Sequence, residues 1–192
     1  MEIELKYALE NVEQYDALIA HLEGYSGEKA MLLSQTNAFF DTPGLHLKQA
    51  GLILRLRTEN NRFILTAKGT APADVSGGDT LACRLEEETE ITAEEAQALL
   101  TNQTNPIQLL EKGDWPQDAQ DQKNRLLLIG HLKTLTTEQS FTPLGSFKND
   151  RRVVPVTIEN TLFHFECDAT HFSSSHTDYE VEIELSDAAQ AP

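Results

Sequence analysis

The sequence has little basic charge and no long hydrophobic run. Among its 192 residues, 15 Lys and Arg stand against 31 Asp and Glu, so the formal net charge is −16. Nucleic acids and anionic membrane surfaces attract proteins through clustered basic side chains, so this balance argues against both as partners. The best apolar run, residues 126–129, is far shorter than the ~20 residues of a membrane-spanning helix. We therefore expect neither nucleic acid nor a membrane as a partner.

Cysteine is also scarce. Cys83 and Cys167 are the two cysteines of the chain, and they lie far apart in the sequence. This usage suits two small buried residues in a reducing compartment better than a disulfide scaffold. The first six residues, Met-Glu-Ile-Glu-Leu-Lys, have neither the basic nor the apolar region of a secretory signal. The sequence therefore predicts a cytoplasmic protein.

Alternating polar and apolar residues predict a chain that is rich in strands. Gly24 is expected to end the first helix, and Thr92 with Glu95 forms a capping box at the start of another. Few helices among many strands favour an α+β domain, with an antiparallel sheet or closed barrel and helices packed on its outside. Strands are expected at residues 2–8, 32–40, 51–58, 62–68, 81–91, 145–158, 161–168 and 178–185, and helices at 11–23, 45–49, 93–101 and 123–134, with helical pieces in 102–122.

The charged residues are sorted by strand. Successive side chains point to opposite faces of a strand, so Arg55 and Arg57 share a face, with three leucines on the other. Glu87 is an exception, because its position places it on the apolar face. The solvated face of an ordinary sheet would explain any single strand. The last strand, however, has three glutamates on one face (Glu180, Glu182 and Glu184), which repel one another unless cations neutralise them.

A closed sheet with these charged faces inward would bring basic and acidic side chains into one lumen. Basic groups suit phosphate oxygens, and clustered carboxylates suit Mg²⁺ or Mn²⁺. The pattern therefore predicts a metal-dependent site for a triphosphate-like anion. The net charge alone would argue that the chain repels polyphosphates, but the distribution of charge can matter more than its sum.

The residues that carry these charges resemble a known family. The segment Glu2-Ile3-Glu4-Leu5-Lys6 is similar to the Glu-x-Glu-x-Lys signature of the CYTH, or triphosphate tunnel metalloenzyme, superfamily. Further segments resemble the family's motifs in the family's order over about residues 2–185. They are Asn37-Ala38-Phe39-Phe40-Asp41-Thr42, Leu54-Arg55-Leu56-Arg57, Leu65-Thr66-Ala67-Lys68-Gly69, Arg84-Leu85-Glu86-Glu87-Glu88, Arg151, Asp168 and Glu180-Val181-Glu182-Ile183-Glu184.

The resemblance implies a closed eight-stranded antiparallel β tunnel with helices outside, formed as a single domain by residues 1–192. Residues 186–192 would be a short tail, without the family's C-terminal helix. The resemblance implies Mg²⁺ or Mn²⁺ as cofactor, held by Glu2, Glu4, Asp168, Glu182 and Glu184, with Glu86 and Glu88 as further candidates. It implies that Lys6, Arg55, Arg57, Lys68, Arg84 and Arg151 bind the substrate phosphates. The catalytic set would be Glu4, Lys6, Arg57 and Lys68.

Hydrolysis of a small-molecule triphosphate, first of all inorganic triphosphate, is the function that we expect. Three alternatives stay open at this point: cyclisation of ATP to cyclic AMP, hydrolysis of thiamine triphosphate, and non-catalytic binding of polyphosphate. Trp115 and Tyr25 are candidates for an aromatic rim that thiamine triphosphate would need, although a lone Trp in a polar loop is more often a packing anchor. The sequence leaves the oligomeric state open, with a homodimer as one option.

Overall fold

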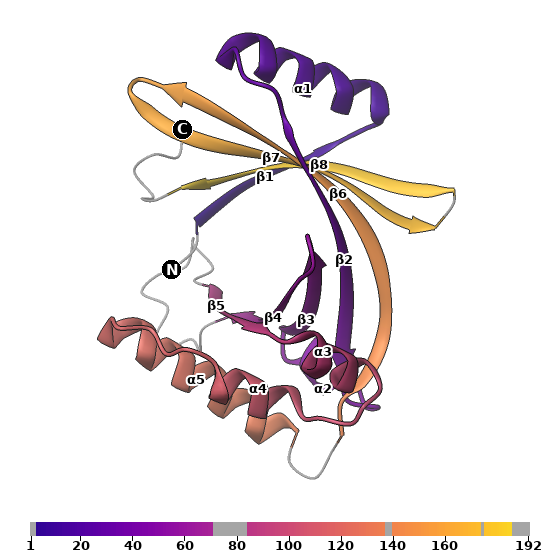
Figure 1. Ribbon diagram of the computed structural model, residues 1–192, viewed down its shortest axis with the longest axis vertical. Helices are drawn as coiled ribbons and strands as arrows, with labels where there is room; N and C mark the ends of the chain where they lie inside the picture. The colour runs from indigo at the N-terminus through magenta and orange to yellow at the C-terminus, as the bar shows by residue number, and fades with distance from the viewer. Residues whose placement is uncertain (1–2, 71–83, 137–139, 174, 186–192) are drawn as a thin grey trace. The chain divides into compact units, whose positions relative to one another are not determined.

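The computed structural model describes residues 3–70, 84–136, 140–173 and 175–185, which form eight strands and five helices (Figure 1). The chain divides into two compact units. Asn37–Ser146 form the first, here called the central unit, whereas Glu2–Thr36 and Phe147–Pro192 form the second, here called the terminal unit. The elements are β1 (Ile3–Leu9), α1 (Val12–Ser26), β2 (Met31–Asp41), α2 (His46–Gln49), β3 (Leu52–Glu59), β4 (Arg62–Thr70), β5 (Arg84–Ile91), α3 (Ala93–Leu100), α4 (Pro106–Lys112), α5 (Ala119–Leu135), β6 (Thr142–Ile158), β7 (Thr161–Ser173) and β8 (His176–Leu185).

The eight strands form one antiparallel sheet, which confirms the predicted α+β class. They are hydrogen-bonded in the order β1-β8-β7-β6-β2-β3-β4-β5, so β1 and β5 occupy the two ends of the sheet. The predicted closure into a barrel is wrong for this structure, because no strand pairing joins β1 to β5 in the part of the chain that is described. Closure requires hydrogen bonds between the first and the last strand of a sheet. Alternation along each strand reveals which side chains share a face, but it carries no information about that final pairing.

In the terminal unit, α1 covers the apolar face of the sheet. Its side chains Tyr15, Ile19 and Leu22 are buried against residues of β6, β7 and β8. Asn11 begins the helix, and its side chain accepts a 2.9 Å hydrogen bond from the backbone N–H of Gln14. The helix ends at Ser26 rather than at Gly24, because Gly27 is the residue that adopts the left-handed conformation (φ 74°) of a C-cap.

In the central unit, α2, α3, α4 and α5 share one core with β3, β4 and β5. The leucines of β3 and alternate residues of β4 are buried against this helical layer, which includes Leu99 and Leu128. The predicted capping box of α3 is confirmed, because Thr92 and Glu95 each accept a hydrogen bond from the other's backbone N–H. Among the described residues, no helix is long and apolar enough to cross a membrane.

A buried arginine joins the helices of the central unit to the sheet. Arg125 of α5 is 1% exposed and donates hydrogen bonds to the backbone carbonyls of Leu110, Gly113 and Asp114. Its guanidinium also lies 3.6 Å from Glu87 and 4.8 Å from the ring centre of Trp115. Glu87 does lie on the apolar face, as its position in the alternation indicates, and burial raises the pKa of its carboxyl although the Arg125 charge opposes this shift. The pair explains how an acidic residue is accommodated on that face.

Several predicted boundaries move. Strand β7 continues to Ser173, five residues beyond the predicted end, and β8 begins at His176, two residues before its predicted start. Helix α5 begins at Ala119, where Asp118 caps it through hydrogen bonds from the backbone N–H groups of Gln120 and Asp121. Residues 71–80 of the predicted loop and residues 81–83 of a predicted strand lie outside the described residues.

Candidate functional site

The face of each unit that does not contact the helices carries a cluster of charged side chains. The alternation that buries Leu54 and Leu56 under the helices turns Arg55 and Arg57 of β3 to the opposite face. The same rule applies in the terminal unit, where the apolar residues of β7 contact α1 and Asp168 takes the other face. Each cluster is described within its own unit below.

The central cluster joins three cations to two carboxylates across three strands. In the strand register, Arg55 of β3 lies opposite Thr66 of β4, and Thr66 lies opposite Glu88 of β5. Glu88 Oε1 accepts a 2.9 Å hydrogen bond from Thr66, and the same oxygen lies 3.7 Å from Arg55 and 3.3 Å from Arg57. Two residues after Thr66 on β4, the Lys68 ammonium lies 2.6 Å from the Glu86 carboxylate of β5. The central cluster therefore consists of Arg55, Arg57, Lys68, Glu86 and Glu88.

The cations of the central cluster lie where they can contact an anion. Their side chains are only partly covered, and that of Arg57 is 17% exposed. The Nε atom of Arg57 is buried and has no hydrogen-bond partner among the described residues. A guanidinium offers five N–H donors in a planar fork that fits phosphate oxygens. Arg55 and Arg57 both lie against the Glu88 carboxylate, and two guanidiniums side by side suit the oxygens of a phosphate.

The terminal cluster has the opposite composition, with four carboxylates around two cations. Arg151 of β6 donates two hydrogen bonds to Asp168 of β7, at 2.8 and 2.7 Å. The same guanidinium is paired with Glu166 and lies 3.2 Å from Glu182 of β8. Lys6 of β1 is paired with Glu182 and lies 3.5 Å from Glu180. The terminal cluster therefore consists of Lys6, Arg151, Glu166, Asp168, Glu180 and Glu182.

Burial and charge shift the pKa values of this cluster. Burial alone would lower the pKa of Arg151, but its hydrogen bonds with Asp168 and the surrounding carboxylates outweigh that effect and raise the pKa. Burial raises the pKa of Glu166, against the opposing charge of Arg151. Burial likewise raises the pKa of Glu180, against Lys6, and the Glu182 charge adds to the rise. These carboxyls are thus held where additional positive charge would stabilise their ionised forms.

Three carboxylates of the terminal cluster could hold a metal ion. One oxygen from each of Asp168, Glu180 and Glu182 lies within 4.8 Å of the other two. Carboxylate oxygens are the ligands that Mg²⁺ and Mn²⁺ prefer, so the donor set fits the expected cofactors. Lys6 and Arg151 already pair with these oxygens, so a metal ion would take over part of their neutralising role.

Polar residues support the terminal cluster from one side. Buried Asn149 donates hydrogen bonds to Asp168 at 2.8 Å and to the side chain of Gln35 at 3.3 Å. Its own side-chain oxygen accepts a hydrogen bond from Thr170 at 3.2 Å. This network fixes the orientation of the Asp168 carboxylate. None of these supporting residues was predicted from the sequence, although Asn149 and Thr170 share the parity of Arg151 and Asp168 on their strands.

The structure brings together nine of the predicted site residues in two groups, and two of them, the further metal candidates Glu86 and Glu88, pair with the cations of the central cluster. Arg55, Arg57 and Lys68 meet in the central cluster, and Lys6, Arg151, Asp168 and Glu182 meet in the terminal cluster. Glu166 and Glu180 join the terminal cluster although the predicted metal set omits them. Glu2 lies outside the described residues, as do the side chains of Glu4, Arg84 and Glu184, although the backbone register pairs Glu4 with Glu184. That all six basic residues share one lumen stays a prediction.

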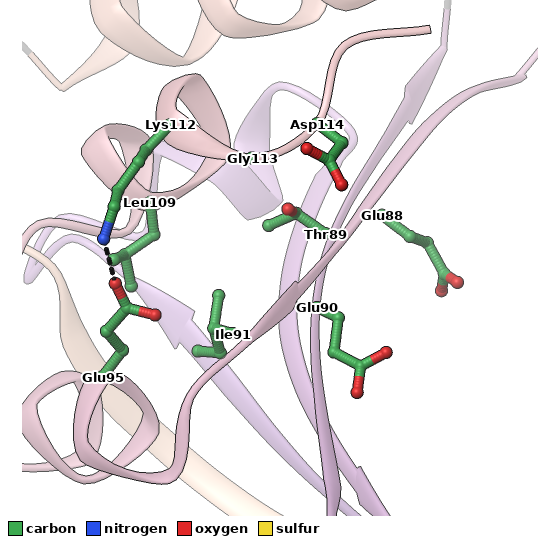
Figure 2. A pocket seen from close by; sticks show the side chains of 9 residues that line it. All are labelled: Glu88, Thr89, Glu90, Ile91, Glu95, Leu109, Lys112, Gly113 and Asp114. Atoms are coloured by element: carbon green, nitrogen blue, oxygen red, sulfur yellow. Dashed lines mark hydrogen bonds and ion pairs between the residues drawn. The ribbon is translucent and has the colours of Figure 1, made fainter.

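The central unit also has a hollow of about 310 Å³ between β5 and the helices α3 and α4. Figure 2 shows the ion pair between Glu95 and Lys112, joined at 2.7 Å, with Ile91 on the same side of β5. The side chains of Glu88 and Glu90 extend to the other side of the strand (Figure 2). The hollow therefore lies on the helical side of β5, and the central cluster on the opposite side.

Comparisons with known proteins agree with this arrangement. A proposed adenylyl cyclase from Hippeastrum, described as having a dominant triphosphatase activity, is 26% identical with a TM-score of 0.70, and the match covers 98% of this chain and 81% of that one. A proposed adenylate cyclase from Bacillus halodurans is 20% identical with a TM-score of 0.62, covering 98% and 82% of the two chains, and shows the fold alone. No curated protein matches the sequence. The CYTH domain family matches residues 1–192, so the chain belongs to the CYTH domain family.

Proposed function

We propose that this protein hydrolyses triphosphates in a metal-dependent reaction, with inorganic triphosphate as the first substrate. The observation that carries the proposal is the central cluster, in which two arginines share one carboxylate and the buried Nε of Arg57 has no partner among the described residues. Membership of the CYTH family supports it. The description of the Hippeastrum relative, a dominant triphosphatase activity, supports hydrolysis over cyclisation.

The chemistry that these residues favour is attack of water in line with the leaving group. The water oxygen forms a bond to the terminal phosphorus while the bond from that phosphorus to the bridging oxygen breaks, which yields phosphate and pyrophosphate. Such transfers need positioning and neutralisation of charge more than covalent help from the protein. We assign binding of the phosphate oxygens to Arg55, Arg57, Lys68, Arg84, Lys6 and Arg151. Fixed cations at these oxygens stabilise the transition state because they need no reorganisation as the charge shifts.

The acidic residues serve the metal ion and the water. When bound, Mg²⁺ or Mn²⁺ would neutralise phosphate charge as a Lewis acid. We propose that Asp168 and Glu182, with Glu2, Glu4 and Glu184, hold the ion, and the geometry adds Glu180 as a candidate. Glu4 is the carboxylate to which we assign orientation of the attacking water, as part of a catalytic set with Lys6, Arg57 and Lys68.

A substrate panel tests the proposal. The purified chain is incubated with inorganic triphosphate, ATP or thiamine triphosphate, each with Mg²⁺, with Mn²⁺ or with a chelator, while released phosphate and cyclic AMP are measured. We expect release of phosphate from inorganic triphosphate with either metal and none with the chelator. Formation of cyclic AMP from ATP in place of phosphate release would instead favour the cyclase. Tight binding of triphosphate without turnover of any substrate would contradict hydrolysis and indicate a binding module.

A further inference from the structure

An aromatic cluster lies at one end of the charged face of the terminal unit. The rings of Phe147 and Phe172 are 5.1 Å apart at an interplanar angle of 58°, and His176 stacks on Phe172 at 5.7 Å and 29°. Phe172 is half exposed, although it contacts two other rings. These three residues come from β6, β7 and β8 respectively, and they are here called the aromatic platform.

The platform shares a sheet face with the terminal cluster. Phe147 has the parity of Arg151 on β6, Phe172 that of Asp168 on β7, and His176 that of Glu180 on β8. A β-bulge between His171 and Ser173 shifts the register beside Phe172, but the ring contacts place Phe172 with the other two rings. His171 takes the opposite face, where it lies 3.4 Å from Asp150 and 3.0 Å from Thr177.

The platform and the terminal cluster are separated by a regular spacing. Each platform residue lies four positions from a cluster residue along its own strand: Phe147 from Arg151, Phe172 from Asp168, and His176 from Glu180. Four residues of a strand span about 13 Å. The side chains of Asn149 and Thr170 lie two positions from each group and are hydrogen-bonded to one another, so the strands that hold both groups are tied together. Three phosphates and a sugar or short linker separate an aromatic base from a terminal phosphoryl group by a similar length.

From this spacing we propose that the aromatic platform stacks the ring of an organic triphosphate whose phosphates reach the two cations of the terminal cluster, Lys6 and Arg151. The inference rests on the proposed function and extends it from inorganic triphosphate to triphosphates that carry an aromatic ring. Stacking suits the platform because every nucleobase and heteroaromatic ring has a flat π-face that phenylalanine can cover. The three rings themselves have no carboxylate or guanidinium, although Asp178 of β8 lies 3.3 Å from the edge nitrogen of His176, so the ring faces select for a flat ring rather than for one base.

Substitutions at Phe172 test the proposal through the ratio between substrates. We expect Phe172→Ala to raise the KM for ATP and for thiamine triphosphate about tenfold, the range of one lost stacking contact, while the KM for inorganic triphosphate is unchanged. Phe172→Trp should keep the preference because it keeps a ring, and Phe172→Leu should lose it although it stays apolar. Tyr7→Ala is the matched control, because this exposed aromatic residue pairs with Val181 and so lies on the other face of the sheet, which α1 covers. If Phe172→Ala raises the KM for ATP and the KM for thiamine triphosphate equally, the platform binds aromatic rings in general. If it raises the KM for one of them alone, the platform prefers the ring of that substrate.

Two results would overturn the platform. One is an equal change in the KM for inorganic and for organic triphosphates in the Phe172→Ala variant. The other is a change in the oligomeric state alone, measured by light scattering, which would show that the platform is a contact between copies of the chain. Binding keeps the test separate from turnover: calorimetry with an ATP analogue that has a methylene bridge between its last two phosphates gives a Kd without hydrolysis. If the chain hydrolyses no triphosphate but Phe172→Ala still weakens this analogue about tenfold, the platform stands and the proposed function fails. If turnover occurs and the analogue binds both proteins equally, the platform fails and hydrolysis stands.

Discussion

Among the described residues, three cations meet two carboxylates in the central cluster, whereas four carboxylates meet two cations in the terminal cluster. Both clusters are built in the same way, from alternate residues of adjacent strands, three in the central cluster and four in the terminal cluster, whose other face is covered by helices. Their difference therefore comes from residue identity alone. An excess of cations suits phosphate oxygens, and an excess of carboxylates suits a divalent metal.

This comparison shows why the net charge of the chain is a poor guide to its ligands. The total of −16 would predict repulsion of any polyphosphate. In the central cluster the local balance is the reverse, and the field that a ligand meets is dominated by the nearest groups, because salt screens those beyond about 10 Å. In the terminal cluster Arg151 reaches Glu166, Asp168 and Glu182 at once, so even there the acidic groups are partly neutralised.

The largest expected effect comes from removing a cation of the central cluster. Arg57→Ala should lower the rate of triphosphate hydrolysis by about 10²–10³-fold, as the loss of one fixed donor to a developing charge does in other enzymes. The fold should persist, because Arg57 contacts Glu88 on the polar face and no core residue is removed. The measurement is phosphate release at saturating metal, with thermal unfolding as the check on folding.

Arg62→Ala provides the matched control. Arg62 lies on β4 of the same unit and pairs with Glu90 at 2.8 Å, but its side chain is 58% exposed. The loss of an exposed pair costs little, so activity and stability should both stay close to those of the parent protein. Similar losses of activity in Arg57→Ala and Arg62→Ala would contradict the assignment of the central cluster to substrate binding.

A smaller effect is expected from the acidic side of the comparison. Glu180→Gln should raise the concentration of Mg²⁺ or Mn²⁺ needed for half-maximal hydrolysis of inorganic triphosphate by about tenfold, because it removes one of three candidate ligands. Glu180 is a better test than Asp168, since Asp168 is buried and holds Arg151. The measurement is a metal titration of activity.

Asp150→Asn is the control for this titration. Asp150 precedes Arg151 on β6 but faces the other way, where it accepts a 2.8 Å hydrogen bond from Ser34. Asparagine can accept the same bond, so the metal requirement should not change. If Asp150→Asn and Glu180→Gln shifted the titration equally, a general loss of negative charge would explain both, and the metal assignment would fail.

Much of this arrangement could be predicted from the sequence because the responsible signals are local. Alternation placed Arg55 and Arg57 on one face and the neighbouring leucines of that strand in the core, and Thr92 with Glu95 marked the start of a helix. These features depend on residues a few positions apart, whose geometry is set by the strand and helix repeat. The same alternation predicts which charged residues share a face in each of the two clusters.

What could not be predicted depends on residues far apart in the sequence. Glu180 and Glu182 were equal candidates by parity, and only the contacts of Lys6 and Asp168 show that both belong to the terminal cluster. The pairing of the two end strands, on which barrel closure depends, has no local signal. The partner of Glu87 could not be named either, because Arg125 lies 38 positions away on a helix with polar residues around it.

The pair of Glu87 and Arg125 gives the smallest effect and contrasts with the two clusters, since it lies on the helical side of the sheet. Burial raises the pKa of Glu87, so the folded chain binds this proton more tightly than the unfolded chain does. Its contribution to stability is therefore full below the usual carboxyl pKa and is lost as the pH rises through the raised value. Glu87→Gln cannot ionise, so the free energy of unfolding of the variant relative to the parent should increase across that window and stay level above it. Urea unfolding of both proteins from about pH 4 to about pH 8 measures this difference, and a difference that does not change with pH would show that Arg125 fully offsets the cost of burial.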